Sequence, residues 1–134
     1  MICVVIDTNV LVSAFLSRKA TSATVLVLEN MFEERIRAVY NEEILDEYNE
    51  VLRRAKFGFR EADIVAVMNY IAERGLHADK IPFDGDMPDE KDRAFYEVSL
   101  NEECSYLVTG NLKHFPVAPK VVSPAELIAI LRNR

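Results

Sequence analysis

The chain has 134 residues, of which 50% are hydrophobic and 28% are charged, and its formal net charge is −6. This length and composition predict one globular domain, residues 1–134, and no apolar run is long enough to cross a membrane. The acidic charge excludes a broadly basic nucleic-acid surface, but clustered carboxylates also make the site of a metal-dependent nuclease acidic until cations bind.

The N-terminal stretch "ICVVIDTNVLVSAF" joins two apolar runs at one aspartate. The first run predicts a buried strand over 2–6, followed by helical segments over about 9–17 and 21–33. No basic segment precedes this run, so we expect no signal peptide and a cytoplasmic location. Asp7 either caps the following helix or lies at the carboxyl end of a strand, where open α/β sheets bind ligands.

Further along, strand-like and helical stretches alternate. We predict strands over 36–40, 76–81, 105–109 and 119–122, helices over 41–55, 60–74, 89–103 and 124–132, a loop over 82–88 and a turn over 110–115. The last helix carries a capping box, with Ser123 at the N-cap, Pro124 at the first position and Glu126 at the third. The alternation predicts an α/β fold with a parallel sheet covered by helices on both faces.

One acid of the predicted helix 41–55 borders its buried face. The apolar stripe of this helix is formed by Ile44, Leu45, Tyr48, Val51, Leu52 and Ala55. At about 100° per residue, Glu47 lies roughly 95° from the centre of the stripe, whereas Glu43 lies about 135° away. Glu47 is therefore either a chemical group beside the core or a solvated acid that pairs with an arginine such as Arg54.

The segment "DMPDEKDRAFYEVSL" has three aspartates, Asp86, Asp89 and Asp92, around a predicted helix start. Asp89 follows Pro88 and is a natural N-cap, so its expected role is structural. Asp92 shares a helix face with Phe95, Tyr96 and Ser99 and is the better chemical candidate. The alternative is that Asp92 is a first-turn acid favoured only by the helix dipole.

A fourth polar segment, "CSYLVTGNLKHF", ends a predicted strand in Thr109, Gly110 and Asn111. Carboxyl ends of parallel strands meet at one edge of a sheet, so these side chains are expected near Asp7. Carboxylate and amide oxygens suit Mg²⁺ or Mn²⁺. No GxSxG, GxGxxG or P-loop pattern is present, and Asn9 replaces the second acid of a phosphatase-like Asp-x-Asp pair.

These four segments resemble the PIN domain family, and especially its toxin components of toxin–antitoxin pairs. "VIDTNVLVSAF" resembles the opening strand with the first acid, Asp7, and "NEEILDEYNEVLRRAKF" resembles the segment with the second acid, Glu47. "DEKDRAFYEVSL" is similar to the segment with the third acid, Asp92. "YLVTGNLKHF" is similar to the fourth segment, but Asn111 stands where many PIN domains have an aspartate.

The resemblance implies three layers, with a parallel sheet of about five strands between helices. It also implies a Mg²⁺- or Mn²⁺-dependent endonuclease that cuts single-stranded RNA, forms a homodimer and is inhibited by a cognate antitoxin. Asp7 and Asp92 would hold the metal, Glu47 would position or deprotonate water, and Thr8, Asn9, Thr109 and Asn111 would surround them. The expected phosphate contacts are Arg53, Lys113 and His114. The alternative is a catalytically weak PIN-like module that binds RNA or a protein, for which Asn111 is the main support.

Overall fold

Strands and helices alternate along the chain as the hydrophobic pattern predicts. The structure is a computed structural model that describes all residues from 1 to 134. Its elements are β1 (Ile2–Ile6), α1 (Thr8–Leu16), α2 (Ala23–Phe32), β2 (Ile36–Tyr40), α3 (Glu42–Leu52), α4 (Glu61–Arg74), β3 (Leu76–His77), α5 (Arg93–Ser99), β4 (Tyr106–Val108), β5 (Val121–Val122) and α6 (Pro124–Arg132). None of the helices has both the length and the apolar character needed to span a membrane.

The five strands form one sheet in the order β3-β2-β1-β4-β5, and every pair is parallel. In the register of the sheet, β1 lies between β2 and β4, with Val4 opposite both Ala38 and Tyr106. Val4 and Ile6 are fully buried, as is typical of a central strand covered on both faces. The carboxyl ends of all five strands therefore meet at one edge.

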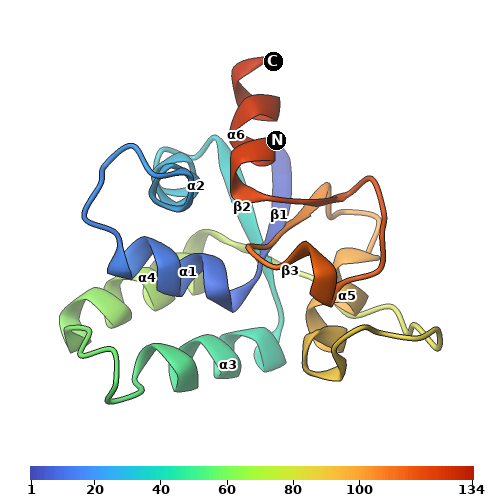
Figure 1. Cartoon of the computed structure of the whole chain (residues 1–134), viewed down its shortest axis with the longest axis horizontal. Coiled ribbons are helices and arrows are strands. Elements are labelled where there is room, and N and C mark those ends of the chain that lie inside the picture. Colours follow the sequence, from blue (N-terminus) through green and yellow to red (C-terminus); the bar gives the residue numbers. More distant parts are fainter.

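Helices cover both faces of the sheet and make the three-layer α/β/α fold that the sequence predicts. The helices α2 and α4 pack against β2, whereas α5 packs against β1 and β4. In Figure 1, α1, α2 and α4 lie to the left of β1, and α5 lies to its right. One cluster of 32 buried hydrophobic residues joins the layers.

Two predicted elements are shorter than expected. The predicted strand 76–81 ends at His77, because the chain then leaves β2 and crosses to α5, where the amide of Ile81 donates to the carbonyl of Glu97 at 2.9 Å. The predicted helix 89–103 is a 3-10 turn over Glu90–Asp92 followed by α5, which ends at Ser99. A turn at Asn101 stops α5, since its carbonyl accepts from the amide of Cys104 at 2.9 Å.

The remaining boundaries differ less. The predicted helix 41–55 ends at Leu52, because the chain turns there and the amide of Arg54 donates to the carbonyl of Val51. The predicted strands 105–109 and 119–122 shorten to β4 and β5, and the predicted turn over 110–115 contains a 3-10 turn at Leu112–His114. The helix α6 has the predicted bounds and the complete capping box at Ser123.

Candidate metal centre

Asp7 lies at the end of β1 but its carboxylate does not cap the next helix. The residue occupies the N-cap position of α1, yet its side chain makes no capping hydrogen bond. Instead, its Oδ2 accepts a 2.7 Å hydrogen bond from the hydroxyl of Thr109, which follows β4. Asp7 is 4% exposed and Thr109 is 0% exposed. Helix capping therefore does not explain why a carboxylate is buried here.

The charge at Asp7 is poorly compensated by the protein. Burial raises the pKa of its carboxyl from 3.8 to about 7; the hydrogen bond from Thr109 lowers this pKa, and the charges of Asp92 and Glu47 raise it. Burial also raises the pKa of Asp92, with a further increase from the charge of Asp89 and a decrease from His114. No arginine or lysine is among the groups that lower these two pKa values. A divalent cation would supply the missing positive charge.

Glu47 is held towards Asp7 by α1. Its Oε2 accepts a hydrogen bond from the hydroxyl of Thr8, the first residue of α1. Glu47 is half-buried, whereas the other acids of α3 are exposed, as the helical wheel predicts; these are Glu42, Glu43, Asp46 and Glu50. The alternative partner, Arg54, pairs with Glu50 at 2.9 Å rather than with Glu47. Glu47 thus makes no salt bridge.

Asp92 belongs to a compact group of three possible metal ligands. The Nδ1 atom of His114 lies 3.2 Å from Oδ2 of Asp92 and 3.6 Å from Oδ2 of Asp89. One ligand atom from each of these residues lies within 4.8 Å of the others. Asp89 also caps the 3-10 turn, since its Oδ1 accepts from the amide of Lys91 at 3.0 Å. The structural role predicted for Asp89 is correct, but its closeness to Asp92 was not predicted, although the Asp-x-x-Asp spacing indicates it.

The turn after β4 is tied to the start of α1 by one further hydrogen bond and braced within itself by another. Oδ1 of Asn9 accepts from the amide of Gly110 at 3.1 Å. The hydroxyl of Thr109, which donates to Asp7, also accepts from the amide of Asn111 at 2.9 Å. Asn9 and Thr109 therefore position the turn, and the Asn111 side chain itself caps nothing.

Most of the predicted site residues line one cavity of about 370 Å³. Its walls are formed by Asp7, Thr8, Asn9, Val12, Glu47, Val51, Arg54, Phe57, Asp89, Lys91, Asp92, Asn111 and His114. Thr109 lies buried beneath it, bonded to Asp7. The cavity therefore contains residues from all four segments that the sequence analysis singled out.

Two predicted phosphate contacts lie outside this cavity. Arg53 caps the end of α3 and turns towards α4, where its Nη2 pairs with Oε2 of Glu61 at 2.8 Å. Lys113 is exposed on the 3-10 turn and does not line the cavity, in contrast to its neighbour His114. The cations that do line it are Arg54 and Lys91, which the sequence analysis did not propose.

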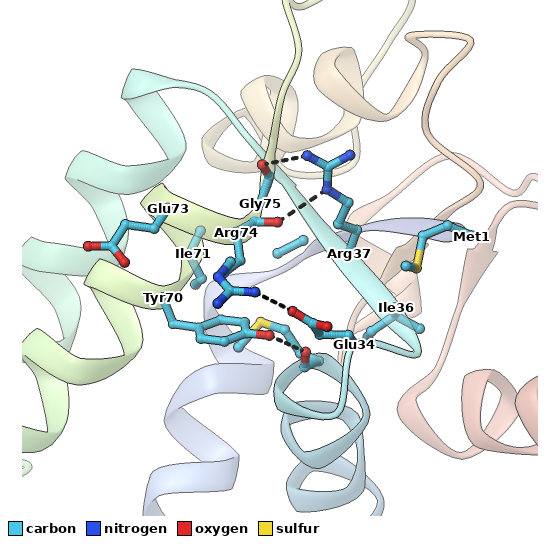
Figure 2. A pocket seen from close by; sticks show the side chains of 11 residues that line it. Met1, Glu34, Ile36, Arg37, Tyr70, Ile71, Glu73, Arg74 and Gly75 are labelled. Carbon is cyan, nitrogen blue, oxygen red and sulfur yellow. Dashed lines mark hydrogen bonds and ion pairs between the residues drawn. The ribbon is translucent and has the colours of Figure 1, made fainter.

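A second cavity of about 370 Å³ lies at the opposite end of the sheet, between the start of β2 and the end of α4. Figure 2 shows that both of its arginines already have partners within the protein. Arg74 pairs with Glu34, and Nε of Arg37 donates to the carbonyl of Arg74 at 3.2 Å. Because this cavity lies at the amino ends of the strands and lacks clustered carboxylates, it is not the candidate site.

Comparison with known proteins agrees with this geometry. Residues 3–113 match the family model described as PIN domain. No curated protein and no solved structure matches the chain significantly. PIN domains are generally metal-dependent nucleases, and the acidic group at this sheet edge could bind a metal ion. Since the matched segment covers well over half of the 134 residues, the chain belongs to the PIN domain family.

Proposed function

We propose that this protein is a Mg²⁺- or Mn²⁺-dependent endoribonuclease that cleaves single-stranded RNA. The observation that carries the proposal is the buried carboxylate of Asp7, whose pKa of about 7 reflects its burial and the charges of Asp92 and Glu47. An uncompensated carboxylate in the interior is costly, and binding a cation removes that cost. Oxygen donors of this kind suit hard divalent cations.

In this proposal, Asp7 and Asp92 hold the metal ion, which when bound neutralises charge on the phosphate and activates water for in-line attack. Glu47 orients the attacking water and accepts its proton, while the hydroxyl of Thr8 keeps the Glu47 side chain in place. His114 contacts the Asp92 carboxylate at 3.2 Å and limits its rotation. Thr109 does the same for Asp7.

Two cations are placed to contact the RNA backbone in this site. Arg54, which follows α3, and Lys91, which precedes α5, both line the cavity. Lys91 is exposed and makes no salt bridge, so its ammonium group is available to a phosphate. We propose these residues, together with His114, as the phosphate contacts.

We further propose that the nuclease is a toxin, that it dimerises and that a cognate antitoxin inhibits it. The support is the resemblance of the four segments to PIN-family toxins, in order and spacing. A small neighbouring gene encoding a DNA-binding protein with a disordered tail is expected. Co-expression of that protein should give a stable complex and abolish RNA cleavage, and a neighbour that neither binds nor inhibits would contradict the toxin role.

A second function is favoured by one observation. Asn111 lines the cavity where many PIN domains have a fourth acid, which leaves the site one negative charge short. A site with weaker metal binding could serve as a catalytically weak module that binds RNA or a protein partner. RNA binding without metal-dependent cleavage would support this alternative.

The direct test is cleavage of a single-stranded RNA by the purified protein with EDTA, Mg²⁺ or Mn²⁺. We expect cleavage only with a divalent cation and at least a hundredfold loss in Asp7→Asn, in line with removal of a metal ligand. Asp46→Asn is the matched control, because Asp46 is an exposed acid of α3 that does not line the cavity. Equal residual cleavage by Asp7→Asn would identify a contaminating nuclease and contradict the proposal.

A further inference from the structure

The candidate site has an aromatic end that the metal chemistry does not use. Phe57 lines the same cavity as Asp7, Glu47 and Asp92, and it is the only phenylalanine or tyrosine that does so. Val12 and Val51 are the only other apolar residues in the lining. A phosphodiester bound at the acids would therefore have an apolar wall with one ring within the same 370 Å³ cavity.

The ring of Phe57 is held by other rings behind it. It stacks on Phe59 with centroids 5.2 Å apart and planes 6° apart. Phe59 in turn packs on Phe15 of α1, with centroids 5.0 Å apart. Gly58, between the two stacked residues, has a φ of 64°, a backbone conformation that favours glycine and lets the two rings lie face to face. The ring is thus ordered before any ligand arrives, which lowers the entropy cost of binding to it.

Cations lie on and near this ring. Nζ of Lys56 lies over the ring of Phe57, 5.2 Å from its centroid, so a base that stacks on this face displaces the ammonium group. Arg54 and Lys91 line the same cavity, and neither Lys56 nor Lys91 makes a salt bridge. Proteins that bind single-stranded nucleic acid combine cations along the backbone with aromatic rings on which bases stack.

We infer that Phe57 is the platform on which one unpaired nucleobase of the substrate stacks, next to the phosphate held at Asp7 and Asp92. The inference rests on the proposed nuclease function and assigns the substrate class to the same site. Only an unpaired base exposes a free face to the ring, so the platform selects single-stranded over duplex nucleic acid. Lys91, which lines the cavity, and Lys56, displaced from the ring, are then the cations that contact the phosphates beside the stacked base.

The experiment separates stacking from charge. Two fluorescein-labelled probes of equal length and charge are compared by fluorescence anisotropy in Ca²⁺: a single-stranded oligouridylate and an abasic ribose-phosphate oligomer. Gel electrophoresis verifies that the probes stay intact. Because base stacking on an aromatic side chain is worth about 1–3 kcal/mol, we expect wild-type protein to bind the base-bearing probe roughly 5- to 150-fold more tightly.

Three variants test the ring itself. We expect Phe57→Leu to bring the affinity ratio of the two probes close to one without changing the affinity for the abasic probe, and Phe57→Trp to keep the ratio. Phe32→Leu is the matched control, because Phe32 is an exposed ring that does not line the cavity. A ratio that survives in Phe57→Leu, a wild-type ratio near one, or a loss of the ratio in Phe57→Trp would overturn the inference.

Cleavage in Mn²⁺ distinguishes this failure from failure of the nuclease proposal. If the wild type cleaves RNA but Phe57→Leu has the same affinity ratio for the two probes as the wild type, the stacking platform alone is contradicted. Protein that prefers the base-bearing probe through Phe57 but never cleaves RNA contradicts the nuclease proposal alone. Thermal unfolding of Phe57→Leu against Phe32→Leu identifies a loss of fold, and in that case the result for Phe57→Trp decides.

Discussion

The hydroxyl of Thr109 donates a 2.7 Å hydrogen bond to Oδ2 of Asp7, and so joins the ends of β1 and β4 inside the protein. The same hydroxyl accepts from the amide of Asn111 at 2.9 Å. One buried side chain thus fixes both the candidate metal ligand and the turn that carries Asn111. Two parts of the candidate site, Asp7 and the turn at Thr109, are thus anchored directly to the neighbouring strands β1 and β4.

Replacing this hydroxyl is expected to destabilise the protein and weaken metal binding. In Thr109→Val, Asp7 loses its hydrogen-bond donor and the amide of Asn111 loses its acceptor, at a cost of about 1–3 kcal/mol in the free energy of unfolding. Thr109→Ser keeps the hydroxyl and should retain most of the metal affinity. Urea unfolding and Mn²⁺ titration of the two variants measure both effects, and equal metal affinities in Thr109→Val and wild type would contradict the positioning role.

Asp7 is expected to make the stability of the metal-free protein depend on pH. Burial raises the pKa of its carboxyl in the folded chain from 3.8 to about 7, so the folded chain binds this proton more tightly than the unfolded chain. Asp7 therefore favours folding below about pH 4, and this contribution is lost as the pH rises to about 7. Relative to Asp7→Asn, the wild type should lose roughly 4 kcal/mol over that range.

The measurement is urea unfolding of both proteins in EDTA at several pH values. Comparison with Asp7→Asn removes most of the contribution of the other titrating groups, because these are common to both proteins. A difference in unfolding free energy that does not change between about pH 4 and pH 8 would show that the Asp7 carboxyl titrates normally and carries no unpaired charge.

Placing a fourth acid at position 111 is expected to strengthen metal binding and to destabilise the metal-free protein. Asn111→Asp adds a carboxylate to a cavity that already contains those of Asp7, Glu47 and Asp92. Like charges repel, so the unfolding free energy in EDTA should fall by about 1–2 kcal/mol, while the Mn²⁺ affinity rises roughly tenfold. Asn111→Ala, which only removes the amide, should show neither change. A Mn²⁺ affinity no higher in Asn111→Asp than in the wild type would contradict the placement of residue 111 beside the metal.

The sequence predicted a helix or strand correctly where nearby residues determine its ends. The strand β1 follows from a short apolar run rich in β-branched residues, and α6 starts at a capping box. The predicted helix 89–103 failed because its apolar pattern continues to Leu100, whereas its end depends on the backbone turn at Asn101. The predicted strand 76–81 is too long, because after His77 the chain turns to α5, where the amide of Ile81 bonds to the carbonyl of Glu97.

For the candidate site, the placement of acids was predictable and the choice of cations was not. Asp7 could be placed because parallel strands share one carboxyl edge, and Glu47 because a helix has a regular period. Arg53 and Arg54 are neighbours in sequence, and only the packing of α4 shows that Glu61 binds Arg53. Phe57 was missed because its place in the cavity depends on the turn at Gly58 and on Phe59 behind it.

Isothermal titration of Mn²⁺ into the wild type, Asp7→Asn and Asp46→Asn tests the metal centre most directly. We predict that the wild type and Asp46→Asn bind Mn²⁺ equally, and that Asp7→Asn binds at least tenfold more weakly. Because the pKa of Asp7 is about 7, binding near that pH should also release part of a proton, which buffers of different ionisation enthalpy detect. Equal Mn²⁺ binding by Asp7→Asn and the wild type, or no binding by either, would contradict a metal centre at Asp7.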